Sequence, residues 1–370
     1  MNQTESAQVT RNFSRIIAFD VARAFALFGM IFVNFKITIG AETVTGDLLG
    51  DLIGLLEGRA AALFVILAGT GLSLLSRKAR ESKDAARLAA NRVMIWRRAL
   101  FLFVFGLLYT PIWPADILHF YGVYLLFGGM LLNHADRTLI NASVLFVLIG
   151  YALLFTLDYA GDWNFTTLEY HNFWTLTGLI KHLFFNGFHP VFPWASFLTF
   201  GMWLGRLDLS SAVVRRKLWV QSLWVFVAAQ WVLPFLFAAL FRMLEVSTED
   251  TAALVSRSPM PPTPFYIFSA GATACMLLLA CFSLCDQLVA RRRLQPLVAT
   301  GQMALTLYVA HVLIGMGGLE AMGLLGGQSL AFSALAALTF SALCVAFATA
   351  WRAKFRHGPV EWFMRKTTGF

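Results

Sequence analysis

Three polar side chains interrupt an otherwise apolar run near the start of the chain. The stretch from Arg15 to Lys36 is long enough to cross a bilayer, yet it contains Asp20, Arg23 and Asn34. At 100° per residue, Arg23 and Asn34 lie about 20° apart around a helix, and Asp20 lies within about 60° of Arg23. Polar groups inside hydrocarbon cost free energy unless they pair or line a wet cavity. We therefore predict that one face of a membrane helix carries a functional polar stripe.

A second candidate for proton chemistry is an acid that precedes a histidine by three residues. Asp116 and His119 follow a proline-containing turn, and their spacing places both on one face of a helix. A carboxylate at this position can orient the imidazole and raise its basicity, which general-base catalysis requires. The alternative is a hydrogen-bonded pair in the headgroup zone. His311, with Tyr308 one turn before it in a later apolar run, is the next candidate base, and a structural role for it stays equally open.

The composition restricts the class of protein that can carry these groups. Only 13% of the 370 residues are charged and 58% are apolar, which is more apolar surface than one soluble core could bury. We predict an all-α polytopic protein with the lipid bilayer as its surroundings. The formal net charge of +9 clusters between apolar runs, as orientation signals do, so nucleic acid is not expected as a partner. The four cysteines lie in apolar runs, where we expect buried thiols.

About ten apolar segments of span length follow one another, and together they predict a membrane helical bundle. They cover residues 16–36, 57–76, 98–113, 117–133, 138–158, 189–207, 218–242, 264–286, 303–323 and 329–351. The most basic connector is the linker 77–98, for which we expect a helix. The positive-inside rule places this linker and both terminal tails, residues 1–14 and 352–370, in the cytoplasm. No linker or repeat separates domains, so residues 1–370 are predicted to form a single integral membrane domain.

Several polar or aromatic side chains are expected at the outer ends of these segments. Arg59 lies at the start of the second segment, and His189 and Trp194 lie at the start of the sixth. We assign acceptor binding to them, together with Asp20 and Arg23; for His189 the alternative is an anchor at the membrane interface. The sequence contains no H-E-x-x-H motif, thiolate pair or clustered ligands, so no metal is expected. It also lacks a P-loop and a G-x-S-x-G elbow.

The polar stripe in FDVARAFALFGMIFVN resembles the opening of the transmembrane acyltransferase superfamily. That superfamily includes heparan-alpha-glucosaminide N-acetyltransferase, the YeiB-like membrane proteins of bacteria and the inner-membrane O-acyltransferases. Other pieces are similar to the YeiB-like branch, namely EGRAAALFVILAGTG, WPADILHFYG, GQMALTLYVAHVLI and FRHGPVEWFMRK. The run HPVFPWASFLTFGMWLGR is similar both to that branch and to the heparan enzyme.

The resemblance implies transfer of an acyl group, usually acetyl, from cytoplasmic acyl-CoA across the bacterial inner membrane. The acceptor would be a hydroxyl or amine of a glycan or small molecule at the outer side. Asn34 falls where the heparan enzyme carries an active-site asparagine. Two positions depart from the family pattern: Ala24 follows Arg23 where glycine is usual, and the first outer loop lacks the catalytic histidine. The base must therefore come from elsewhere in the chain.

Thioester acyl transfer needs a base for the proton of the acceptor and donors for the charge that develops on the carbonyl oxygen. We assign the donor to Asn34 and the base to His119, oriented by Asp116. His311 is the second choice of base, if the reacting atoms meet deeper in the bundle.

The phosphates of acetyl-CoA need a basic mouth on the cytoplasmic side. The candidates are Arg291, Arg292 and Arg293 and the basic linker 77–98, although topology signals explain both equally well. Two other function classes stay open. A transporter or flippase of an anionic or amphipathic solute would use the same buried charges, but its signature of interrupted spans in two matching halves is not found. A non-catalytic subunit would explain the missing loop histidine. The sequence decides neither the acceptor nor whether a homodimer forms.

Overall fold

The structure is a computed structural model that describes residues 3–40, 48–165, 167–287 and 291–369, with side chains from residue 17 onward except residues 291 and 292. The described chain is mostly helical. Within these ranges the sheet structure consists of β1 (Trp163–Asn164) and β2 (Glu169–Tyr170), which pair antiparallel. The predicted all-α class is confirmed. Residues 41–47 of the predicted first outer loop lie outside the described residues.

Counted over the described residues, seven helices are long and apolar enough to cross a membrane. They are Ile17–Ile39, Leu48–Glu81, Asp136–Leu154, Ala212–Met243, Pro264–Gln287, Ala304–Ala321 and Leu330–Arg352. Two apolar helices are shorter, α5 (Leu118–Met130) and α8 (Val191–Leu204), and they fall on the predicted segments 117–133 and 189–207. The length and apolar composition of these helices identify the chain as an integral membrane protein. The count of ten spans and the cytoplasmic placement of both termini stay predictions.

The basic linker 77–98 is helical, as expected, but it is not a separate helix. It forms the end of α3 (Arg59–Glu81) and the start of α4 (Ala85–Tyr109). Between them, Asp84 caps α4 by accepting a hydrogen bond from the Arg87 backbone N–H at 2.9 Å. The helix then continues to Tyr109, inside the predicted segment 98–113, because no glycine or proline interrupts the helix formers before Gly106. The membrane boundary expected near residue 98 stays a prediction.

The chain divides into two compact units, each built from separate stretches of sequence. Unit 1 comprises Met1–Phe64, Asp208–Trp219 and Ala274–Lys366, and unit 2 comprises Val65–Leu207, Val220–Thr273 and Thr367–Phe370. Four of the described helices contribute residues to both units, namely α3, α9 (Ala212–Val227), α12 (Pro264–Gln287) and α17 (Pro359–Thr368). Whether the whole chain is one domain stays a prediction.

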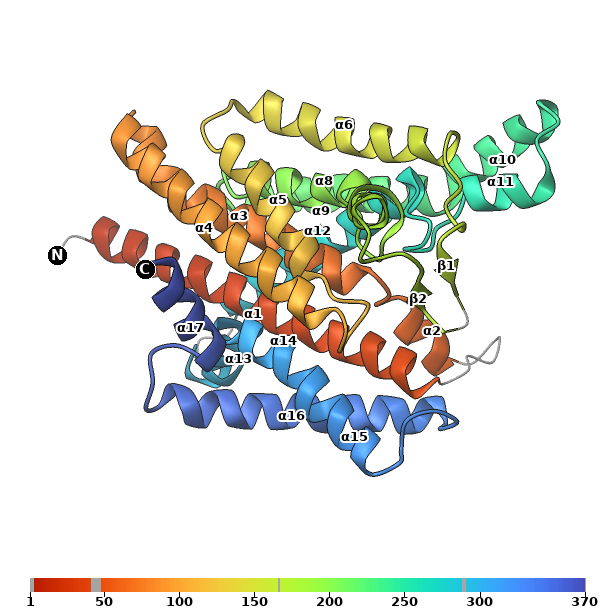
Figure 1. Cartoon of the computed structure of the whole chain (residues 1–370). Helices are drawn as coiled ribbons and strands as arrows, with labels where there is room; N and C mark the ends of the chain where they lie inside the picture. The colour runs from red at the N-terminus through yellow and green to blue at the C-terminus, as the bar shows by residue number, and fades with distance from the viewer. Residues whose placement is uncertain (1–2, 41–47, 166, 288–290, 370) are drawn as a thin grey trace. The chain divides into compact units, whose positions relative to one another are not determined.

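Unit 1 is organised around α1 (Gln3–Ile39), which packs against α13 (Gln295–Gln302), α14 (Ala304–Ala310) and α16 (Leu330–Arg352) (Figure 1). Many apolar side chains of α1 are buried, with Leu27 and Ile31 among the completely buried ones. Burial of such apolar surface is the main favourable term that holds the helices together within a unit. The shorter elements of this unit are α2 (Leu48–Gly54), the 3₁₀ turn Arg291–Leu294, the π-helical turn His311–Met316, α15 (Gly317–Ala321) and α17 (Pro359–Thr368).

In unit 2, α5 packs against α4 and α8, and α8 also packs against α6 (Asp136–Leu154). Large aromatic side chains fill this core, and Trp194, Tyr124 and Phe120 are completely buried. The shorter elements of the unit are α7 (Leu176–Lys181), the π-helical turns His182–Asn186 and Ala228–Val232, α10 (Leu233–Met243) and α11 (Thr248–Leu254).

The four cysteines belong to unit 1 and are buried, as expected from the sequence. Cys275, Cys281 and Cys285 lie on α12, and Cys344 lies on α16.

Candidate functional site

The charged groups of the polar stripe form a hydrogen-bonded chain in unit 1. Arg23 and Asp20, three residues apart on α1, make an ion pair. Gln302 donates from Nε2 to Oδ2 of Asp20 at 2.8 Å, and its Oε1 accepts from Nη2 of Arg352 at 2.7 Å. The Asp20 side chain is 6% exposed, whereas that of Arg23 is 32% exposed. The carboxylate is thus buried with donors around it, and the Arg23 guanidinium remains partly accessible.

A glycine allows α13 to approach α1 at this point. A Cβ atom at Gly301 would lie 1.9 Å from the backbone oxygen of Asp20, so a larger residue would push the two helices apart. The contacts of Gln302 and Arg352 in this chain were not predicted, because both residues lie far from Asp20 in the sequence. The signal that was available is the Gly301–Gln302 pair at the start of the motif GQMALTLYVAHVLI.

Asn34 meets His311 in the same unit. The amide Nδ2 of Asn34 lies 2.9 Å from Nε2 of His311, and Nδ1 of His311 contacts the backbone oxygen of Tyr308. A carbonyl oxygen can only accept, so Nδ1 carries the proton, and Nε2 of the neutral ring keeps a lone pair that accepts from Asn34. His311 is buried and Asn34 is half-buried. The pair therefore combines a basic nitrogen with an amide donor.

Unit 1 contains three more charged residues near the end of α1 and the start of α3 in the sequence, namely Lys36, Glu57 and Arg59. Lys36 at the end of α1 makes an ion pair with Glu57, with 2.6 Å between Nζ and Oε1. Arg59, which we predicted to bind the acceptor, begins α3 and is half-buried. Its role in binding stays a prediction.

In unit 2, Asp116 orients His119 at the start of α5. The carboxylate oxygen Oδ2 of Asp116 lies 3.1 Å from Nδ1 of His119, and it also accepts from the backbone N–H of Leu118 at 2.9 Å. Nδ1 therefore donates, and Nε2, buried without a hydrogen-bond partner among the described residues, holds the lone pair. α4 approaches closely here, because a Cβ at Gly106 would lie 2.3 Å from the backbone nitrogen of His119. The predicted pairing of Asp116 with His119 is present.

Three histidines gather around Phe120 in unit 2. The rings of His119 and His182 stack with centroids 5.7 Å apart, and His189 packs edge-on against Trp194 at 4.6 Å. Phe120 contacts all three histidine rings. Burial, with smaller contributions from His119 and His189, holds the pKa of His182 well below its usual range, so His182 is neutral at neutral pH. The sequence gives no local signal for these contacts of His182, because they join a loop to a distant helix.

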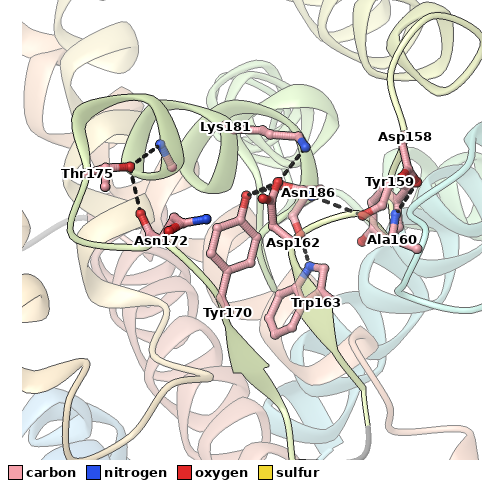
Figure 2. Close-up of polar contacts among 11 residues, drawn as sticks. Asp158, Tyr159, Ala160, Asp162, Trp163, Tyr170, Asn172, Thr175, Lys181 and Asn186 are labelled. Carbon is pink, nitrogen blue, oxygen red and sulfur yellow. Dashed lines mark hydrogen bonds and ion pairs between the residues drawn. The ribbon is translucent and has the colours of Figure 1, made fainter.

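A cavity of about 500 Å³ opens in unit 2 beside His182. Its wall is formed by the turn before α5, by residues 168–175, and by Trp163, His182 and Phe188. Figure 2 shows the hydrogen bonds that fix this wall. The Tyr170 hydroxyl donates to Oδ1 of Asn186 at 2.8 Å, and Nε1 of Trp163 donates to the Asn186 backbone oxygen at 2.6 Å. Lys181 and Asp162 form an ion pair in the same network.

The arginines predicted to bind the coenzyme lie in the connection between α12 and α13. Residues Arg291–Leu294 form a 3₁₀ turn, in which Arg293 is exposed. The side chains of Arg291 and Arg292 lie outside the described residues, so coenzyme binding stays a prediction. Across the described parts of the chain, no three His, Cys, Asp or Glu side chains gather as metal ligands. The expectation that no metal is used also stays a prediction.

The structure thus brings the predicted residues together in two sets. Asn34 pairs with His311 in unit 1, and Asp116 pairs with His119 in unit 2. Asn34 and the first-choice base, His119, belong to different units, whereas the second-choice base contacts Asn34 directly.

Comparison with protein families gives two matches. Residues 15–235 match the family described as "Heparan-alpha-glucosaminide N-acetyltransferase, catalytic", which is more than half of the chain. Residues 204–370 match the family described as "Protein of unknown function (DUF418)". No curated protein matches the chain. Asn34 lies in the first match and His311 in the second, so their hydrogen bond joins the two matched regions.

Proposed function

Because the chain belongs to the family of the heparan-alpha-glucosaminide N-acetyltransferase catalytic domain, we propose that it is a membrane-bound acyltransferase that uses acetyl-CoA as donor. The acceptor is a hydroxyl or amine of a glycan or small molecule at the outer side of the bacterial inner membrane. The observation that carries the proposal is the 2.9 Å contact between Asn34 Nδ2 and His311 Nε2, which places a base beside an amide donor.

In this reaction Nε2 of His311 takes the proton from the acceptor hydroxyl or amine. The acceptor oxygen or nitrogen then attacks the thioester carbonyl carbon, and negative charge develops on the carbonyl oxygen. The acceptor displaces the Asn34 N–H from Nε2, and this freed amide hydrogen is the donor for the developing oxyanion. When the carbon–sulfur bond breaks, the imidazolium returns its proton to the leaving thiolate of the coenzyme.

The polar chain of unit 1 positions these two groups. The ion pair of Arg23 with Asp20, extended through Gln302 to Arg352, ties α1 to α13 and α16. α14 follows α13 directly and ends at Ala310, so His311 is the next residue of the chain. The Arg23 guanidinium is partly exposed, so it can also contact an anionic substrate.

The test measures acetyl transfer from radiolabelled acetyl-CoA to glucosamine by the purified protein. We expect His311→Gln and Asn34→Ala each to lower kcat by about 100-fold or more, because one removes the base and the other the oxyanion donor. His119→Gln should keep kcat within a few-fold, and so should His134→Gln, a variant of an exposed histidine. Each variant is compared at a temperature where its thermal melt shows it folded.

Two results would contradict the proposal. Wild-type protein that consumes no acetyl-CoA with any amine or hydroxyl acceptor would exclude the acyltransferase function. Full activity in His311→Gln together with loss in His119→Gln would move the base to the pair of Asp116 and His119.

A further inference from the structure

The cavity of unit 2 has a wall whose chemistry the acyl transfer does not use. Five of its lining side chains are aromatic, namely Trp163, Tyr170, Phe173, Trp174 and Phe188. Glu169 is the carboxylate in the lining, and neither Lys nor Arg is part of it. An aromatic wall with one carboxylate and no fixed cation attracts a positively charged ligand and repels an anionic one.

The surrounding charges leave the carboxylate uncompensated. Glu169 is exposed and makes no ion pair with any residue that the structure describes. The nearest lysine in the sequence, Lys181, is already paired with Asp162 and does not line the cavity. Burial keeps the pKa of His182 well below its usual range, so this ring adds no positive charge at neutral pH.

One of the rings that line the cavity contains a buried polar atom without a partner among the described residues. His182 lines the cavity and is only 2% exposed, and its Nδ1 has no hydrogen-bond partner among the described residues. A buried ring nitrogen without a partner is unfavourable, and a ligand hydroxyl or N–H that reached it would remove this penalty.

We propose that the cavity is a binding site for an organic ammonium ion that also carries a hydroxyl or N–H donor. The cationic head lies against the aromatic rings and is balanced by Glu169, while the donor satisfies His182. The site does not depend on acetyl transfer, and it is tested by binding alone.

The walls are held in place before any ligand arrives. Asn186 accepts from Tyr170 and Trp163 and donates from Nδ2 to the backbone oxygen of Tyr159 at 3.0 Å (Figure 2). Side chains fixed in this way lose little conformational entropy on binding, which favours affinity for a small ligand.

The experiment titrates the full-length protein with choline by isothermal titration calorimetry. Choline carries a quaternary ammonium head and one hydroxyl, and its carbon isostere 3,3-dimethylbutan-1-ol has the same shape without the charge. Polyoxyethylene detergent micelles are used, because they present neither ammonium nor sugar groups. We expect choline to bind and the isostere to bind at least about 10-fold more weakly, because only choline gains the cation–π and carboxylate attraction.

Two variants locate the binding site, each with a matched control. Glu169→Gln removes the charge but keeps the shape, and it should weaken choline binding by about 5- to 10-fold. Trp174→Ala should weaken binding to a similar extent, about 5- to 10-fold, by removing an aromatic face. The controls Glu245→Gln and Trp224→Ala change exposed residues of the same unit outside the cavity and should leave binding unchanged.

Other outcomes would overturn the proposal. Equal binding of choline and its isostere, or undiminished choline binding in Glu169→Gln, would show that charge does not select the ligand. Binding of methyl glucoside with no binding of choline would assign the cavity to a neutral saccharide. Absence of choline binding at any concentration would also exclude the ammonium site. None of these results bears on acetyl transfer, which is measured separately.

Discussion

His119 and His311 are held in the same tautomer by different acceptors. The Asp116 carboxylate accepts a hydrogen bond from Nδ1–H of His119, and the Tyr308 carbonyl oxygen accepts one from Nδ1–H of His311. In both rings Nε2 is therefore the basic nitrogen. The Asp116 partner could be predicted from sequence because three-residue spacing is local. The contact of Asn34 with His311 spans 277 residues of sequence and leaves no local signal.

The low pKa of His182 makes the stability of the protein depend on pH. The unfolded chain binds a proton near the ordinary histidine pKa of 6.5, whereas the folded chain keeps His182 neutral well below it. The stability is therefore complete above about pH 6.5 and falls as the pH decreases, by at most about 1.4 kcal/mol per pH unit for this one group. The thermal midpoint of His182→Gln, measured from about pH 7.5 to about pH 5, should fall less steeply than that of the wild type.

The exposed His134 provides the control for this measurement. His134→Gln should keep the wild-type pH dependence, because it removes an exposed histidine and leaves the buried His182 in place. Parallel curves for the wild type and His182→Gln would refute the contribution of His182.

At the scale of elements, the C-terminal helix α17 is hydrogen-bonded to the start of α14, the helix that ends just before His311. Glu361 of α17 accepts from the backbone N–H of Leu305 at 2.8 Å and of Thr306 at 3.0 Å, and also from the Thr306 hydroxyl. The first N–H groups of a helix have no partner within the helix, and a carboxylate there also meets the positive end of the helix dipole. The tail motif FRHGPVEWFMRK thus has a structural role in unit 1.

Removal of this carboxylate should loosen α14. We expect Glu361→Ala to destabilise the protein by about 1–3 kcal/mol, since two backbone donors and a hydroxyl lose their acceptor. Glu361→Gln should lie between the wild type and the alanine variant, because an amide oxygen still accepts. Thermal melts in detergent measure the effect, with Glu320→Gln, an exposed residue of α15, as the control. If the thermal midpoint of Glu361→Ala equals that of the control, the hydrogen bonds of Glu361 to α14 do not stabilise the protein.

Helices were easier to predict than their ends. The apolar runs indicated α12 and α16 within a few residues, because a bilayer-length apolar sequence has few alternatives. α1 begins at Gln3, well before the predicted segment 16–36, because its first turns are polar. The charge pattern did not indicate that one helix, α4, joins the basic linker to the next apolar segment, because the charge pattern changes inside α4 while the helix does not. Packing partners such as α13 on α1 depend on Gly301, whose significance appears only when the opposing backbone is known.

For the whole molecule, the alternation of basic connectors predicts that both termini lie in the cytoplasm. Green fluorescent protein fused to either end should therefore fluoresce in a bacterial host, because it folds only on that side of the inner membrane. Alkaline phosphatase at the same ends should be inactive. An epitope inserted after Glu245, in an exposed turn of the predicted outer connector, should be labelled from outside. Active phosphatase at one end alone would require an odd number of spans.

The ion pair of Asp20 with Arg23 also has a consequence for biosynthesis. The ribosome adds Gln302, the other side-chain donor to Asp20, 282 residues after Asp20 itself. While the nascent first helix leaves the translocon, its carboxylate must already be neutralised, and Arg23 lies one turn away for that purpose. When α13 and α16 have been made, the hydrogen bonds from Gln302 to Asp20 and from Arg352 to Gln302 connect these late helices to the first helix.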